Sequence, residues 1–304
     1  MQQTEYKIRY SLLKIIRNLL FFVHFPVMYV LSDISFYILY YLIRYRRRIT
    51  RKNLTESFPE KTRQEMIAIE KQFYRFFVDL LFEICKMASC SEQEMRRRMR
   101  FVNIEEVNQM LDSGKSISIF MGHYGNWEWA SSLPLHLSKQ VVAGQIYHRL
   151  SNHFFDRLLL RNRSRWGAQS IEMNQTLRWI TAHTGQGQIT ITGYIADQAP
   201  GYAHAQHHVH FLNHLTPAVT GAEKITRKYG FEAYYLDMER KRRGFYEARF
   251  VRIGETSPSL ADFQLTDRYF ELLEETIRKR PEFYLWTHNR FKHATTKLLQ
   301  EINL

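Results

Sequence analysis

The residues best suited to chemistry are a histidine and a glutamate in the pattern H-x4-E, His123 and Glu128. A neutral imidazole, with an ordinary pKa of about 6.5, accepts a proton at cellular pH. A carboxylate bonded to the other ring nitrogen would fix the tautomer and stabilise the imidazolium that forms. Such a dyad needs no serine or cysteine nucleophile, because it can activate an acceptor hydroxyl to attack a thioester. We therefore predict His123 as the general base and Glu128 as its partner.

Both residues lie in the segment Phe120-Met-Gly-His-Tyr-Gly-Asn-Trp-Glu-Trp129, where an apolar strand is predicted to end and a helix to begin. Gly122 and Gly125 permit a tight turn with unusual backbone angles, and Asn126 is a preferred helix cap. His123 would then lie at the edge of a sheet where ligands bind in open α/β folds. The same spacing also fits a capped helix with a surface His–Glu pair, so the motif alone leaves both interpretations open.

Strand and helix patterns alternate through the rest of the chain. Strands are predicted at 115–121, 141–147, 188–195, 207–211, 233–237, 245–253 and 283–286. Helices are predicted at 60–90, 96–100, 127–137, 153–163, 174–183, 217–229 and 266–279. This alternation predicts an α/β fold with a mixed central sheet flanked by helices, preceded by an amino-terminal hydrophobic helical segment that anchors the protein to a membrane.

The amino-terminal segment combines basic and apolar stretches. Residues 1–18 are basic and amphipathic, and the apolar residues 19–43 are interrupted by Pro26 and Asp33 before an arginine-rich run. About 20 apolar residues suffice to cross a bilayer, although a central aspartate is costly in lipid. Three interpretations stay open: a single span, an anchor in the membrane plane, and a buried helical hairpin broken at Pro26 and Asp33. We predict a membrane anchor at 1–52 and a globular domain at 53–304.

The chain is strongly basic, with 43 Lys and Arg against 30 Asp and Glu and a net charge of +13. This excess suits nucleic acid, an anionic membrane surface or an acidic partner. No zinc-finger spacing or other nucleic-acid-binding motif accompanies it, so we expect no nucleic-acid partner. Cys85 and Cys90 lie in an apolar helical stretch without a second pair, which predicts reduced thiols rather than a zinc site or disulfide framework.

Several short motifs, in order along nearly the whole chain, resemble the bacterial lipid A late acyltransferases, within the lysophospholipid and glycerolipid acyltransferase superfamily. The H-x4-E element of His123 and Glu128 matches that family's catalytic dyad, and Asp197-Gln198 matches an Asp-Gln pair after a strand. The other matching stretches are Tyr45-Arg46-Arg47-Arg48 with Asn53 and Phe58-Pro59-Glu60, Phe82-Glu83-Ile-Cys-Lys86, Arg163-Ser-Arg165-Trp-Gly167, and Trp286-Thr-His288-Asn-Arg290-Phe-Lys292.

The resemblance implies that residues 53–304 are an acyltransferase domain. It implies a fatty acyl donor carried by acyl carrier protein, or by coenzyme A, and an anionic glycolipid acceptor, a lipid A precursor, at the cytoplasmic face of the inner membrane. Acidic acyl carrier protein and a phosphorylated acceptor would both suit a basic chain. Arg163 would lie near the reacting groups, where it or turn amides hold the oxyanion, and Asp197 is carried over as a further site residue. No metal or organic cofactor is expected.

The chain departs from the family pattern at two places. Tyr147-His148-Arg149 stands where Tyr-Arg-Pro is usual, and Phe211-Leu-Asn213 replaces a Phe-Phe-Gly turn. Around the second lies a histidine-rich stretch: His204, His207, His208, His210 and His214. His208 and His210 would share one face of a strand, but no carboxylate cluster accompanies them to favour a metal site.

These departures bear on the acceptor more than on the reaction class. Another membrane lipid, such as an ornithine or glycine lipid or a phosphatidylinositol mannoside, or a pigment, stays open as the acceptor. An inactive, membrane-tethered lipid-binding protein is the alternative from another class.

Overall fold

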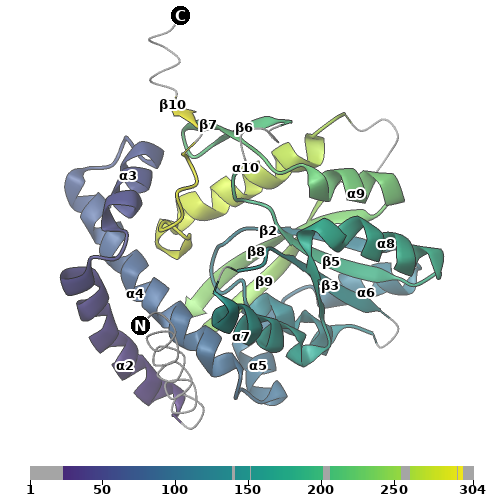
Figure 1. Cartoon of the computed structure of the whole chain (residues 1–304), viewed down its shortest axis with the longest axis horizontal. Coiled ribbons are helices and arrows are strands. Elements are labelled where there is room, and N and C mark those ends of the chain that lie inside the picture. The colour runs from purple at the N-terminus through teal and green to yellow at the C-terminus, as the bar shows by residue number, and fades with distance from the viewer. Residues whose placement is uncertain are drawn as a thin grey trace, which may run out of the picture.

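The computed structural model describes residues 23–138, 141–150, 152–200, 206–254, 261–292 and 294–296. The predicted basic segment 1–18 and His204 lie outside these residues. A seven-stranded sheet forms the centre (Figure 1), in the order β1-β9-β8-β2-β5-β3-β4. Its strands are β1 (Met99–Phe101), β2 (Ile117–Met121), β3 (Val142–Tyr147), β4 (Gln169–Glu172), β5 (Thr190–Ile195), β8 (Glu232–Arg242) and β9 (Phe245–Gly254). Only the β8–β9 pair is antiparallel, so the sheet is mixed.

Helices cover both sides of this sheet, with α8, α9 and α10 on one side and α5 and α7 on the other (Figure 1). The α-helices are α2 (Phe25–Tyr37), α3 (Arg47–Ser57), α4 (Arg63–Met87), α5 (Glu92–Arg98), α6 (Ile104–Asp112), α7 (His153–Arg163), α8 (Thr176–Gly185), α9 (Gly221–Tyr229) and α10 (Gln264–Lys279). The predicted α/β fold, with a mixed sheet flanked by helices and an amino-terminal apolar helix, is confirmed.

Shorter elements complete the fold. They are the π-helix η1 (Ile38–Ile43), the 3-10 helices η2 (Trp129–His136), η3 (Ser164–Trp166), η4 (Met173–Gln175) and η6 (Pro281–Phe283), and a small sheet β10-β7-β6 of Thr295–Thr296, His214–Pro217 and His208–Phe211. β2 lies between two neighbours and is buried along its whole length, which explains its uninterrupted apolar sequence. The site therefore grows from the most buried strand.

Several predicted boundaries are wrong. No strand forms at 283–286: the chain makes the 3-10 turn η6, and Tyr284 pairs with Tyr124 in a single isolated bridge. The helix expected at 217–229 begins at Gly221, because Pro217 ends strand β7. The helix expected at 127–137 is the 3-10 helix η2, which contains Pro134. The basic stretch at 96–100 is split between α5 and β1.

The apolar amino-terminal segment forms one continuous helical stretch, Phe25–Ile43, long and apolar enough to cross a bilayer. Pro26 sits in its first turn, where proline is tolerated, and the helix runs through Asp33 without a break. A hairpin broken at Pro26 and Asp33 is therefore not what the chain forms. One side of the helix packs on α4, which begins with a capping box between Thr62 and Glu65.

Candidate active site

The turn after β2 depends on two glycines. Gly125 has φ of +60°, a conformation that favours glycine. Gly122 is required for a different reason, since a Cβ there would come within 2.6 Å of Leu273 on α10. Asn126 caps the following turn, as predicted, by accepting a hydrogen bond from the backbone N–H of Trp129 at 3.1 Å. This compact turn fixes the side chain between the two glycines, His123.

His123 and Asp197 meet because their strands are parallel neighbours. Met121 of β2 pairs with Ile195 of β5, and each functional residue follows its strand end by two positions. Nδ1 of His123 lies 2.6 Å from Asp197 Oδ1, and the backbone N–H of His123 donates to Oδ2 at 3.2 Å. Asp197 is therefore the carboxylate that orients the imidazole. The sequence had placed Asp197 only among the substrate-binding residues.

The charge of Asp197 is stabilised by its surroundings. Burial by itself would raise its pKa, but the charge of His123 and the two hydrogen bonds from His123 outweigh burial, with a smaller effect of Arg290, and hold the pKa below its ordinary value. An ionised Asp197 accepts a proton from Nδ1, which leaves Nε2 with its lone pair. Gln198 Nε2 lies 3.3 Å from that lone pair. The histidine side chain is 17% exposed, so a substrate can reach it.

Glu128 lies beside His123 but makes different contacts from those predicted. Its carboxylate accepts two hydrogen bonds from Arg163, from Nε at 2.8 Å and from Nη2 at 2.6 Å, and one from Trp127 Nε1 at 3.2 Å. In the part of the chain that the structure describes, neither ring nitrogen of His123 bonds to Glu128. The sequence therefore identified the residue but not its partner. The ring of Trp127 lies against the imidazole, with centroids 5.1 Å apart, and joins the two ion pairs into one site.

The Glu128–Arg163 pair is buried and charged. Burial would raise the pKa of Glu128, but the charge and the hydrogen bonds of Arg163 lower it overall, helped by His123 and Trp127. Burial would likewise lower the pKa of Arg163, and Glu128 raises it instead. The pair comes from η2 and α7, which lie far apart in sequence, and it closes one wall of the site. Arg163 is thus close to the reacting groups, with two of its nitrogens already engaged.

The closing motif supports the catalytic turn from below. The backbone N–H of Gly125 donates to Phe283 O at 3.0 Å, and the backbone N–H of Leu285 donates to His123 O at 3.1 Å. Asn53 of α3 in turn holds the carbonyls of Trp286 and His288. This part of the motif therefore has a structural role, and the hydrogen bonds explain why an apolar run became a turn instead of a strand.

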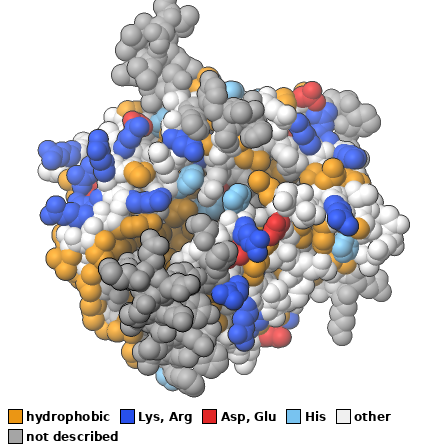
Figure 2. Space-filling view, viewed as in Figure 1, with side chains coloured by type: hydrophobic (Ala, Val, Ile, Leu, Met, Phe, Trp, Pro, Cys, Tyr) orange, Lys and Arg blue, Asp and Glu red, His pale blue; other side chains and the backbone are white. Residues whose placement is uncertain are grey.

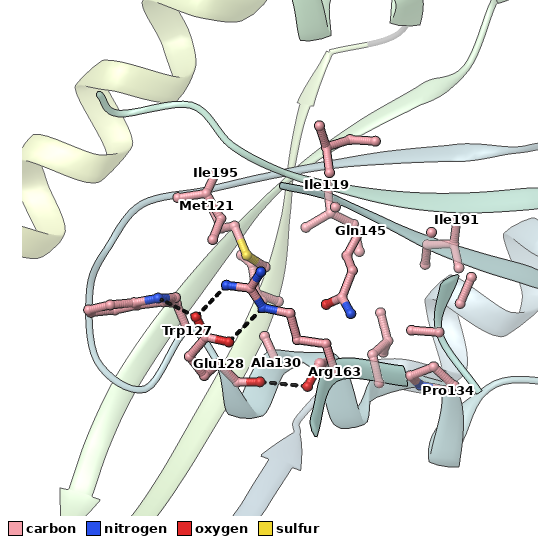
Figure 3. Close-up of a pocket in the computed structure, with 18 residues that line it drawn as sticks. Ile119, Met121, Trp127, Glu128, Ala130, Pro134, Gln145, Arg163, Ile191 and Ile195 are labelled. Atoms are coloured by element: carbon pink, nitrogen blue, oxygen red, sulfur yellow. Dashed lines mark hydrogen bonds and ion pairs between the residues drawn. The ribbon is translucent and has the colours of Figure 1, made fainter. Parts of the chain in front are cut away.

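An apolar cavity of about 60 Å³ opens beside the ion pair (Figure 3). Alternate residues of two strands face it, Ile119 and Met121 from β2, and Ile191, Gly193 and Ile195 from β5. Glu128 and Arg163 form its polar side (Figure 3). Its volume accommodates a few methylene groups, not a whole fatty acyl chain.

The histidine-rich stretch is dispersed in the structure. His207 bonds to Asp267 at 2.6 Å, and buried His214 bonds to Leu212 O at 2.6 Å. His208 and His210 lie on one exposed face of β6, as their alternation predicted. Within the described ranges, no group of three or more His, Cys, Asp or Glu side chains is placed to hold a metal.

The two thiols are poorly suited to nucleophilic attack. Cys85 and Cys90 are free, and burial raises the pKa of each thiol to about 11. The thiolate is the reactive form of cysteine, and very little of it is present near pH 7. The chemistry of the site therefore depends on His123 and its surroundings.

Comparison with known proteins agrees with this geometry. A model of the family described as bacterial lipid A biosynthesis acyltransferase matches residues 2–293. The chain belongs to this family. A lipid A biosynthesis acyltransferase of Haemophilus influenzae is 22% identical over 183 residues, which make up 60% of this chain and 56% of that protein. The chain thus matches little more than half the length of this relative. Within the lipid A acyltransferase family, the H-x4-E element here is placed by β2, the most buried strand of the sheet.

Sequence reasoning missed two relationships within this lipid A acyltransferase site. The first is the His123–Asp197 contact, which two strands ending one residue before a small polar segment could have indicated once they were known to be parallel neighbours. The second is Gln198, quoted only as half of a motif. Its amide lies at the one imidazole nitrogen that stays free for a substrate.

Proposed function

We propose that the protein transfers a fatty acyl chain from a thioester on acyl carrier protein, or on coenzyme A, to a hydroxyl of a glycolipid acceptor, a lipid A precursor. The reaction takes place at the cytoplasmic face of the bacterial inner membrane. The observation that carries the proposal is an imidazole held by a buried carboxylate at Nδ1, with Nε2 facing the open edge of the sheet. Membership of the lipid A acyltransferase family supports the reaction class.

In the proposed mechanism, Nε2 of His123 accepts the proton of the acceptor hydroxyl, whose oxygen attacks the thioester carbonyl. Asp197 orients the ring and stabilises the imidazolium. The tetrahedral intermediate collapses as the C–S bond breaks, and His123 returns its proton to the departing thiolate. A C–O bond has formed, a C–S bond has broken, and no external oxidant or reductant takes part.

The oxyanion needs donors that are not already in use. The backbone N–H groups of His123, Tyr124 and Gly125 donate to Asp197, Gly122 O and Phe283 O. Turn amides at these three positions are therefore poor candidates. We propose that Arg163 fills this role through Nη1, because Glu128 engages its Nε and Nη2 and so fixes the direction of the guanidinium.

The acyl chain is proposed to extend into the apolar cavity beside this ion pair. Gly193 offers a direct test, because a Cβ added there meets only the backbone oxygen of Gly144, at 3.9 Å. Gly193→Val should shift donor preference toward shorter chains, by about fourfold in kcat/KM for each methylene that no longer fits. The measurement is competition between donors of different chain length.

Thr192→Val provides the matched control. Thr192 precedes Gly193 on β5 and points to the opposite face, and its buried hydroxyl has no hydrogen-bond partner among the described residues. This variant should keep the wild-type preference. An equal shift in both variants would mean that general loosening of β5, and not occupation of the cavity, sets chain length.

Purified membranes with labelled acyl carrier protein and an under-acylated lipid A precursor test the function itself. Transfer of label to the precursor is expected, with coenzyme A thioesters compared as donors. If label moves only to another lipid of a total cell extract, the reaction stands and the acceptor is wrong. If no lipid is labelled although the protein retains a bound acyl chain, the alternative of an inactive lipid-binding protein is favoured.

A further inference from the structure

The helical stretch Phe25–Ile43 presents its apolar side outward. Its polar groups face the protein: Tyr29 donates to Glu83 at 2.9 Å, Ser32 donates to Asp79 at 2.6 Å, and Tyr40 donates to Glu70 at 3.0 Å. All three acceptors belong to α4. The outward residues recur at helical spacing and are each 40–77% exposed: Val27, Val30, Leu31, Ile34, Ile38, Tyr41 and Leu42. We call these seven residues the outer stripe.

The contacts along this helix are incompatible with a crossing of the bilayer. Asp33 is paired with Arg243 of the β8–β9 turn at 2.7 Å, and the same guanidinium reaches Asp79 on α4 at 2.6 Å. Arg75 of α4 is exposed and lies over the ring of Phe36. A spanning helix would carry these charged groups into hydrocarbon, at high cost. A helix lying flat leaves them on the protein side.

Cations gather at the carboxyl-terminal end of the outer stripe. A hollow on α3 is lined by Arg44, Arg47, Arg48, Arg51 and Lys52, with Thr55 and Glu56. Figure 2 shows Lys and Arg side chains collected over α3 at the upper left, next to a hydrophobic hollow. Glu70 pairs with Arg47 and Arg51. An apolar strip next to exposed cations matches a surface of acyl chains and anionic headgroups.

We infer that the outer stripe lies in the plane of one leaflet of an anionic membrane, with Arg48 and Lys52 at its headgroups. The stretch is 19 residues long, so it contacts lipid over about 28 Å. This placement rests on the proposed membrane location, but its test reads lipid contact and not acyl transfer, so either proposal can fail alone.

Nitroxide labels on single added cysteines test the placement. The full-length protein would be labelled at Val27→Cys, Ile34→Cys or Leu42→Cys and bound to vesicles of phosphatidylethanolamine and phosphatidylglycerol. All three labels should lie at one depth, about 5–10 Å below the phosphates, as judged by collision with oxygen and with a water-soluble nickel chelate. Protein without an added cysteine gives the background of Cys85 and Cys90, and Leu177→Cys on α8, similarly exposed, should stay in water.

Two outcomes would overturn the inference. A depth maximum at Ile34, with Val27 and Leu42 at opposite interfaces, would show a span. Labels that all remain in water would show that the outer stripe does not touch lipid. The headgroup contact is tested by Arg48→Ala/Lys52→Ala, which should weaken partitioning into these vesicles about 25-fold, or about fivefold for each cation. Arg249→Ala/Lys279→Ala, two exposed cations elsewhere, should change it little. Equal losses in both double variants would remove the headgroup assignment.

Discussion

Replacing His123 with alanine is expected to lower kcat/KM for acyl transfer by about 100- to 10,000-fold, the range that a general base contributes. The imidazole is the only side chain whose free nitrogen faces the accessible part of the described site. The measurement is initial rate with labelled acyl carrier protein and lipid acceptor, with thermal unfolding to show that the variant is folded. A variant as fast as wild type with every acceptor would rule out the mechanism.

Asp197→Asn separates the two carboxylates that have been proposed to orient His123. Asparagine fits the space, but its amide can donate to Nδ1 and so leave Nε2 protonated, the wrong tautomer for a base. In a comparable triad this change costs about 10,000-fold in kcat, and we expect a loss of that order here. The pH profile should also change, since the carboxylate no longer stabilises the imidazolium.

Glu128→Gln is the matched comparison for Asp197→Asn. If it alone abolished transfer while Asp197→Asn stayed active, the pairing predicted from the H-x4-E spacing would hold in the working enzyme, and the contacts seen here would not be the ones that matter. The structure favours the opposite order, because Asp197 contacts His123 twice and Glu128 contacts Arg163 twice.

The sequence predicted the site residues better than it predicted their pairing. His123 and Glu128 stand close in the chain, so a contact between them was the natural expectation. Asp197 is 74 residues away, and only the parallel register of β2 with β5 brings it to Nδ1. Strand order is a tertiary property, and one chain without it offers no means to choose between two nearby carboxylates.

Long periodic segments were predicted well and short ones poorly. The helix α4 and the strands β2, β5 and β9 carry enough apolar repeats to be recognised. β1, of three residues, is too short to show any alternation, and it forms only because it pairs with β9. The run at 283–286 failed for the reverse reason: its apolar pattern is strand-like, but its backbone is required to hold the His123 turn. The division predicted at residue 52 stays a prediction.

The Glu128–Arg163 pair is expected to be the most strongly coupled contact of the site in a double-mutant cycle. Its side chains are 6% and 16% exposed. Removing one partner of a buried pair leaves an uncompensated charge and costs about 3–5 kcal/mol, so Glu128→Gln and Arg163→Met should each lower the free energy of unfolding by that order. The double variant should lose much less than the sum, because no charge is left unpaired.

A surface pair provides the control for this cycle. Arg268 and Glu271 are 2.9 Å apart but 46% and 62% exposed. The corresponding changes Arg268→Met and Glu271→Gln should couple by about 0–1 kcal/mol. Similar coupling energies for the two pairs would contradict the buried, charged description of Glu128 and Arg163.

Acid unfolding gives the same pair a second readout. Arg163 holds the pKa of Glu128 below its ordinary value of 4.5. The stability that this provides is complete above pH 4.5 and is lost as pH falls through the lower, folded pKa. Arg163→Met should therefore weaken the acid dependence of unfolding. Activity then decides the role of the pair: a stable double variant without transfer would show that the aimed guanidinium is needed at the oxyanion, whereas recovered transfer would reduce Glu128 and Arg163 to a wall of the site.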